Sequence, residues 1–144
     1  MPAKDAIHDI VKAALIKDGW KITHDPYTIQ YDNTRMYADL GAKKVIAAEK
    51  DKRKIVVEIK SFLGLSIMDD LENALGKFVL YRSILRVVEP ERQVYLAVSD
   101  ETFANVLGTT SGQVVMRDLA LHVILVDVDK VEVTEWIEQS NTAK

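Results

Sequence analysis

The chain has 144 residues, a net charge of −3 and no cysteine. These totals exclude disulfide bonds, thiolate catalysis and cysteine-based zinc sites, and they argue against a protein that holds nucleic acid by bulk positive charge. The first residues lack the apolar core of a signal peptide, and no run of about 18 apolar residues occurs. We therefore expect a soluble, cytoplasmic protein with no membrane span, folded as one domain over residues 1–144.

The first predicted element is a helix that ends near Gly19, a residue that commonly stops helices. Its apolar face is formed by residues at helical spacing: Ile7, Ile10, Val11, Ala14 and Leu15. Residues 20–31 then read as a strand that Pro26 interrupts, which suits an edge strand or a bulge.

One further extended segment and a hairpin follow. Residues 35–42 form an extended segment after a turn at residues 32–33. Residues 45–50 and 53–62 are β-branched or apolar runs joined by a short polar tip, which predicts a hairpin.

A long helix is predicted from about Ser66 to Val88. Ser66 followed by Asp69 resembles a capping box, with aspartate in place of the usual glutamate or glutamine, and Pro90 ends the helix. One stripe of this helix is apolar, which predicts that it packs on the sheet: Leu71, Ala74, Leu75, Phe78 and Leu85.

The last third of the chain contains two apolar strands, at residues 93–99 and 121–128. Neither alternates cleanly, which predicts burial on both faces. A short helix is expected at about residues 101–107, and residues 131–140 form a weak final strand. The order α-β-β-β-α-β-α-β predicts an α/β (α+β) fold with a mixed central sheet.

Positive charge gathers between Ala42 and Lys60, where seven cations stand against three anions. The ordinary interpretation of such a run is a solvated hairpin tip, and the alternative is a surface that contacts DNA phosphates. The candidate DNA-binding residues are Lys43, Lys44, Lys52, Arg53 and, further along the chain, Arg82.

Two charged residues near the end of the run 53–62 form a candidate site. Alternation along a strand puts Val56, Glu58 and Lys60 on one face. By themselves Glu58 and Lys60 fit an ordinary polar face. Asp39, set among apolar neighbours, changes the interpretation because a carboxylate there must be solvated, paired or bound to metal. If its strand lay beside that of Glu58, the two carboxylates could hold Mg²⁺ (or Mn²⁺), and Lys60 could polarise a water that attacks a phosphodiester.

This spacing resembles the D…(D/E)-x-K signature of the restriction-endonuclease-like, or PD-(D/E)xK, nucleases. Asp39 is followed by eighteen intervening residues and then Glu58-Ile59-Lys60. The predicted order α-β-β-β-α-β is similar to the core of those nucleases, with an extra helix and a C-terminal strand. The resemblance implies Asp39, Glu58 and Lys60 as catalytic residues, with Asp39 and Glu58 as metal ligands.

A narrower resemblance covers residues 2–138. The segments "HDIVKAALIKDGWKIT", "YADLGAKKVIAAEK", "KIVVEIKSFLG", "ALGKFVLYR" and "VYLAVS" resemble the XisH family, the fdxN-element excision controlling factors of cyanobacteria. This resemblance implies a role in controlled, site-specific excision of a DNA element. It also implies DNA and a protein of the XisI type as partners, and a site-specific recombinase indirectly; a homo-oligomer is a further expectation.

One segment departs from the pattern of these relatives. They carry Q-x-x-x-Y on the helix after E-x-K, whereas here Lys77 and Tyr81 hold the two positions. Tyr81 is carried over as an accessory site residue, and Lys77 only in part, because its ammonium is a point charge rather than a planar amide. The alternative for Tyr81 and Arg82 is ordinary packing on the helix surface.

Further accessory candidates are His8 and Asp9 in the first helix and Glu49 in the hairpin. Some nucleases of this fold bring an acidic residue of the first helix to the metal, but a solvated helix face is the ordinary alternative. Glu49 could line the site or pair with a lysine of the hairpin. His24 and His122 show no zinc-ligand spacing.

Two functions remain open from the sequence. One is a metal-dependent nuclease-like protein that acts in DNA excision. The other is a non-catalytic accessory module that keeps the nuclease fold and binds DNA or a partner protein to license a separate recombinase. The net negative charge and Lys77 favour the second, and the joint presence of Asp39, Glu58 and Lys60 favours the first.

Overall fold

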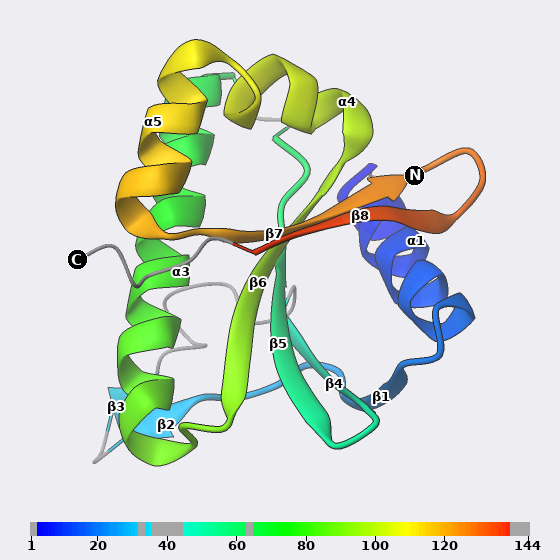
Figure 1. The fold of residues 1–144 in the computed structure, drawn as a ribbon, viewed down its shortest axis with the longest axis vertical. Helices are drawn as coiled ribbons and strands as arrows, with labels where there is room; N and C mark the ends of the chain where they lie inside the picture. Colours follow the sequence, from blue (N-terminus) through cyan, green and yellow to red (C-terminus); the bar gives the residue numbers. More distant parts are fainter. Residues whose placement is uncertain (1–2, 32–33, 36–44, 63–64, 139–144) are drawn as a thin grey trace.

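A mixed six-stranded sheet forms the centre of the molecule in the computed structural model, which describes residues 3–31, 34–35, 45–62 and 65–138 (Figure 1). Within that part of the chain, β5 and β7 each pair in parallel with β6, and the other neighbours are antiparallel. In spatial order the strands are β1 (Lys21–His24), β4 (Val45–Lys50), β5 (Arg53–Ile59), β6 (Arg92–Ser99), β7 (His122–Asp127) and β8 (Glu132–Glu138). The predicted α/β (α+β) class and mixed sheet are confirmed.

The strand predicted over residues 20–31 is divided in two. β1 ends at His24, occupies one edge of the sheet and shifts register between Ile22 and His24. Pro26 lies just beyond it, and a proline has no N–H to donate to a strand ladder. The chain then forms β2 (Gln30–Tyr31), which pairs with β3 (Thr34–Arg35) in a separate small sheet. Residues 36–44, which hold most of the extended segment predicted at 35–42, lie outside the described residues.

Helices cover both faces of the sheet (Figure 1). α1 (Ala3–Lys17) packs on one face, where Val11, Ala14 and Leu15 are fully buried. It ends two residues before Gly19, which has a φ of +96°, so the predicted stop is confirmed. No helix in the described part of the chain is both long and apolar enough to cross a membrane.

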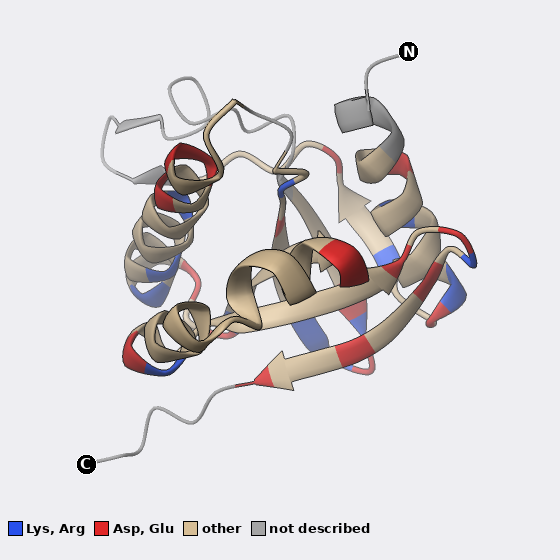
Figure 2. Cartoon of the chain, turned by 90° about the horizontal axis from the view of Figure 1, so that it is seen from above, with Lys and Arg blue, Asp and Glu red and all other residues tan. Residues whose placement is uncertain are grey.

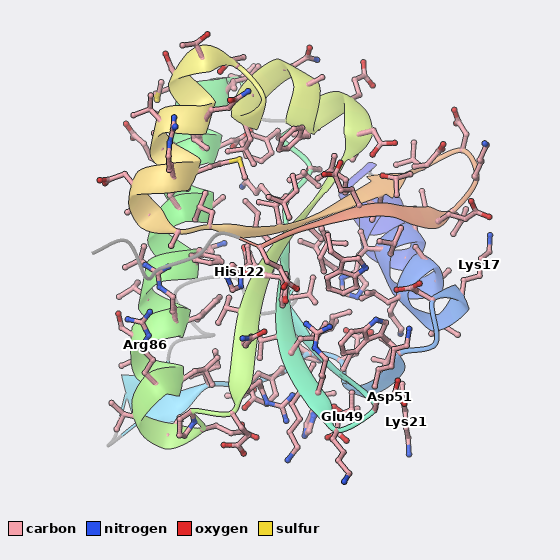
Figure 3. The ribbon with its side chains drawn as sticks, in the orientation of Figure 1. Lys17, Lys21, Glu49, Asp51, Arg86 and His122 are labelled. Atoms are coloured by element: carbon pink, nitrogen blue, oxygen red, sulfur yellow. The ribbon has the colours of Figure 1, made fainter. Side chains whose placement is uncertain are left out.

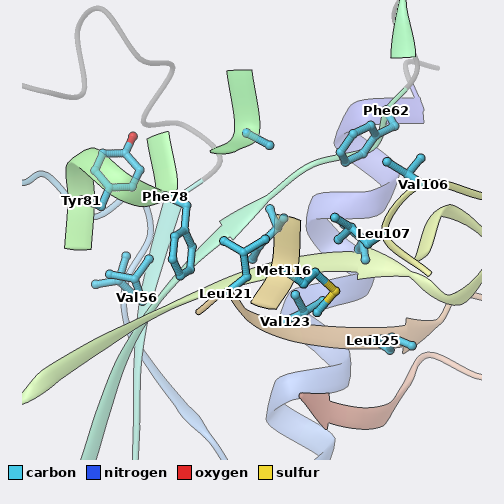
Figure 4. Close-up of a cluster of buried hydrophobic side chains, with 14 of the residues drawn as sticks. Val56, Phe62, Phe78, Tyr81, Val106, Leu107, Met116, Leu121, Val123 and Leu125 are labelled. Atoms are coloured by element: carbon cyan, nitrogen blue, oxygen red, sulfur yellow. The ribbon is translucent and has the colours of Figure 1, made fainter. Parts of the chain in front are cut away.

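α3 (Ile67–Val88) covers the other face of the sheet. Ser66 caps it, because its hydroxyl oxygen accepts a hydrogen bond of 3.1 Å from the N–H of Asp69. Ala74, Phe78 and Leu85 of the predicted apolar stripe are buried in the cluster shown in Figure 4, where Phe78 and Tyr81 lie over Val56 of β5.

The connection from β6 to β7 contains more helix than the sequence predicts. The expected helix at residues 101–107 is present as α4 (Asp100–Thr102) followed by a π-helical segment, η2 (Phe103–Leu107). A second helix, α5 (Thr110–Leu119), is missed by the sequence analysis. It begins in a run of Thr, Ser and Gly that reads as a loop, and it is capped by Thr109, whose hydroxyl accepts from the N–H of Gly112 at 3.0 Å.

The alternation of β5 assigns its side chains to two cores. Ile55, Val57 and Ile59 lie in the core under α1, and Val56 lies in the core under α3. Period-2 geometry therefore places Glu58 on the α3 face with Val56, as the sequence predicts.

Candidate functional site

Glu58 occupies the centre of the sheet, near the carboxyl end of β5. Its neighbours in register are Val45 of β4 and Leu96 of β6, and its exposed fraction is 0%. Oε2 of Glu58 lies 3.7 Å from Nζ of Lys77 in α3, and 12% of the Lys77 side chain is exposed. An ionised carboxylate at such a depth requires a compensating charge, and Lys77 provides one.

Lys60 follows β5 directly and continues its alternation. Its N–H donates to the carbonyl of Ala97 at 3.2 Å, which extends the parallel ladder with β6 by one step. Its Nζ lies 3.7 Å from Oδ1 of Asp70 in the first turn of α3, and both side chains are largely buried. β5 and the residue that follows it thus form two ion pairs with α3, one through Glu58 and one through Lys60.

Tyr81 completes the group and is itself 1% exposed. Burial, and secondarily the negative charge of Glu58, raise the pKa of its phenol well above the usual value. Its hydroxyl has no hydrogen-bond partner among the described residues. We call Glu58, Lys60, Asp70, Lys77 and Tyr81 the Glu58 cluster.

The sequence analysis missed Asp70, although a signal was present. Residues 70, 77 and 81 stand at i, i+7 and i+11, which places them on one face of a helix. The Q-x-x-x-Y comparison reaches only Lys77 and Tyr81 of that face, and helical spacing is the signal that links Asp70 to them. The cluster lies beside that stripe, where the helix meets β5.

The accessory candidates of the first helix lie elsewhere. Nε2 of His8 is 3.1 Å from Oδ1 of Asp25, and Nζ of Lys12 is 2.6 Å from Oδ2 of the same residue. α1 packs on the face of the sheet opposite Glu58, and Asp9 is exposed there. The sheet therefore separates His8 and Asp9 from the Glu58 cluster.

Glu49 is also distant from the cluster. It faces Lys54 in the register of β4 with β5, whereas Glu58 faces Val45. Four strand steps separate the two positions, about 13 Å along the sheet. Its place beside a hairpin lysine agrees with the structural alternative rather than with a role in the site.

The predicted DNA-binding cations are dispersed. Lys52 is exposed at the tip of the β4–β5 hairpin, at the other end of β5 from Lys60. Arg53 is committed to contacts within the fold, with Nη2 3.3 Å from Oε2 of Glu138 and its guanidinium over the ring of Trp20. Arg82 donates to the carbonyl of Leu119 at the end of α5. Asp39, Lys43 and Lys44 lie outside the described residues.

The described residues meet the requirements of a divalent cation only in part. Glu58 offers the hard oxygen donor that Mg²⁺ prefers. In the part of the chain that the structure describes, however, no three His, Asp or Glu residues are grouped as a metal site. Nζ of Lys77 already lies 3.7 Å from the carboxylate, so a divalent cation at Glu58 would compete with this ammonium.

Comparisons with known proteins agree with the resemblance in the sequence. The XisH family (XisH protein) matches residues 1–134. An XisH family protein from Nostoc punctiforme is 37% identical, with a TM-score of 0.85 over 93% of this chain and 100% of the other. An fdxN element excision controlling factor protein from Anabaena variabilis is 38% identical, with a TM-score of 0.85 over 93% of this chain and 99% of the other. No curated protein matches the chain. This chain belongs to the XisH family.

Proposed function

We propose that this chain acts in the controlled excision of a DNA element, as a nuclease-like protein whose centre is the Glu58 cluster. The printed description of the Anabaena variabilis relative as an excision controlling factor supports the biological role. The observation that carries the chemical part is the fully buried carboxylate of Glu58, with Lys60 two residues later on the same face. A sheet interior rarely retains such a pair on packing grounds alone.

Each residue has a distinct role in this proposal. Glu58, with Asp39, would hold Mg²⁺ or Mn²⁺, which when bound supplies Lewis acidity at the phosphate of the substrate. Lys60 would direct the attacking water and stabilise the negative charge that develops on the phosphate. Asp70 keeps the Lys60 ammonium in place through the contact of 3.7 Å. Tyr81 would offer its neutral hydroxyl as a hydrogen-bond donor, because its raised pKa keeps the proton bound.

The test is a cleavage assay on supercoiled and branched DNA in Mg²⁺ or Mn²⁺, with and without a partner of the XisI type. Glu58→Gln and Lys60→Met should each lower the cleavage rate by about a hundredfold or more. Glu49→Gln is the matched control, because it removes the same charge from the distant end of β4 and should leave the rate unchanged. Cleavage that survives in Glu58→Gln would remove the nuclease part of the proposal.

A second candidate is a non-catalytic accessory module that licenses a separate recombinase. The contact between Lys77 and Glu58 favours it, since this lysine already neutralises the carboxylate that a metal would need. This candidate predicts no cleavage under any condition, and normal excision in cells that carry Glu58→Gln or Lys60→Met. Loss of excision with those variants, when the variant proteins remain folded, would favour the nuclease.

A further inference from the structure

A second polar site lies along the C-terminal half of α3. It is a cavity of about 210 Å³ between the last turns of α3 and the first residues of β6 and β7. Three arginines and a histidine line it: Arg82, Arg86, Arg92 and His122. Among the described residues, no aspartate or glutamate lines the cavity. Figure 3 shows Arg86 on α3 and His122 at the start of β7.

Two of the arginines are not neutralised. Among the described residues, no carboxylate lies within 4.0 Å of the Arg82 or Arg86 guanidinium. Burial, and then the nearby charge of Arg86, lower the pKa of Arg82, as expected when two cations share a partly buried site. Arg92 differs, because its Nε lies 3.1 Å from Oε1 of Glu89.

The Arg82 side chain is held in position before any ligand arrives. Its Nη1 donates to the carbonyls of Leu119 and Ala120 at 2.6 and 3.4 Å. Its guanidinium also lies 5.1 Å from the centre of the Phe78 ring. Nε of Arg82 is buried and has no hydrogen-bond partner among the described residues. A fixed donor of this kind binds an anion without the entropy loss of ordering a long side chain.

We propose that Arg82 and Arg86 form a binding pocket for a phosphate group. Guanidinium groups bind phosphate by paired, charge-assisted hydrogen bonds, and this cavity is large enough to admit one phosphate with its hydration. Charge is also distributed unevenly along α3: Figure 2 shows acidic residues in its first turns and basic residues towards its end. The phosphate belongs either to a nucleic-acid backbone or to a small phosphorylated molecule.

The pocket deepens the proposed function if the phosphate is that of DNA, but it does not depend on cleavage. Nine residues of α3 separate Lys77 from Arg86, which is about 13 Å along the helix axis. That span corresponds to about four phosphates of one DNA strand, at about 3.4 Å of duplex axis per phosphate. A strand held at Arg86 could therefore pass the Glu58 cluster, whether or not the cluster cuts it.

The test measures binding of inorganic phosphate, a nucleoside monophosphate and a short DNA duplex, all in EDTA so that no metal chemistry contributes. Calorimetry should give saturable binding of phosphate that Arg86→Gln weakens about tenfold or more, and Arg86→Lys should restore it in part. The Nε–H resonance of Arg82 should shift on titration with phosphate. Arg86 is exposed and makes no ion pair with the described residues, so these variants should fold as the parent does.

Lys21→Gln is the matched control, since it removes one exposed positive charge on β1, on the other side of the sheet in Figure 3. It should leave phosphate binding unchanged. Duplex binding that weakens with Arg86→Gln, and a salt dependence reduced by about one phosphate contact, would assign the phosphate to DNA. Binding of the monophosphate without the duplex would assign it to a small molecule. Equal effects of Arg86→Gln and Lys21→Gln, or no saturable phosphate binding, would overturn the proposal, while a failed cleavage assay would not affect it.

Discussion

Nζ of Lys77 lies 3.7 Å from Oε2 of Glu58, a carboxylate with an exposed fraction of 0%. The two residues come from the helix and the strand that meet at the centre of the sheet. This contact bears on how the charge of Glu58 is tolerated in the core and on whether a metal ion can reach it.

Lys77→Met should lower the free energy of unfolding by about 3 kcal/mol, because it removes a cation whose Nζ lies 3.7 Å from the buried carboxylate. Urea denaturation measures the change. The double variant Glu58→Gln with Lys77→Met should recover much of the loss, since neither position then carries a charge. Purely additive effects in this double-mutant cycle would show that the pair contributes no coupling.

Lys77→Gln should bind Mn²⁺ about tenfold more tightly than the parent chain. A unit charge about 4 Å from the carboxylate competes with a divalent cation by a few kcal/mol at an effective dielectric constant of 20. Free Mn²⁺ measured by electron paramagnetic resonance gives the affinity, and Lys21→Gln serves as the charge-matched control. An unchanged affinity in Lys77→Gln would mean that the lysine does not control access to Glu58.

Ser66→Ala should destabilise the protein by about 1 kcal/mol through loss of the cap on α3. Ser83→Ala is the control, because it makes the same chemical change at an exposed position inside the helix, where alanine is the better helix former. Thermal unfolding should separate the two variants by several degrees. Similar midpoints for both would contradict a capping role for Ser66.

Stability should fall in acid partly through Glu89. The hydrogen bond from Arg92 holds the pKa of Glu89 below its usual value against the opposing effect of burial, and the hydroxyl of Tyr27 donates a second bond at 2.7 Å. A carboxyl with a lowered pKa in the folded state stabilises the fold above its unfolded pKa of about 4.5 and loses that effect as the pH falls further. Glu89→Gln should therefore be less stable than the parent at pH 7 and nearly equal to it at pH 3. A stability difference that persists unchanged at pH 3 would contradict this assignment.

Glu89 also changes the pKa of Tyr27, and titration can measure this effect. Burial, and then the bond to Glu89, raise the pKa of Tyr27 to about 12. Spectrophotometric titration of the parent and of Glu89→Gln should show one tyrosine whose midpoint falls in the variant. Identical titration curves would mean that the hydrogen bond between Tyr27 and Glu89 does not form in solution.

Patterns within single helices and strands were sufficient to predict much of the fold. The alternation of Ile55, Val57 and Ile59 assigned Glu58 to the opposite face of β5, and the structure agrees because the two-residue period of a strand is a property of the backbone. Ser66 and Pro90 likewise marked the ends of α3, since capping and the missing proline N–H act within a few residues. Local patterns did not predict α5, the helix that follows residue 107. Its Thr and Ser residues favour turns, and contact with η2 and the cap at Thr109 turn them into the start of α5.

Periodicity and motif spacing were sufficient to predict the class of fold, the face of Glu58 and Lys60, and the resemblance to the XisH family. The side chains that meet at Glu58 and Lys60 depend on how the helices pack on the sheet. The position of α3 along β5 brings Lys77 to Glu58 and Asp70 to Lys60, and α1 keeps His8 on the other side of the sheet. The packing of α3 against β6 and β7 also forms the cavity at Arg82 and Arg86. Periodicity specifies directions within one element, but the distance between charges on different elements depends on how those elements pack.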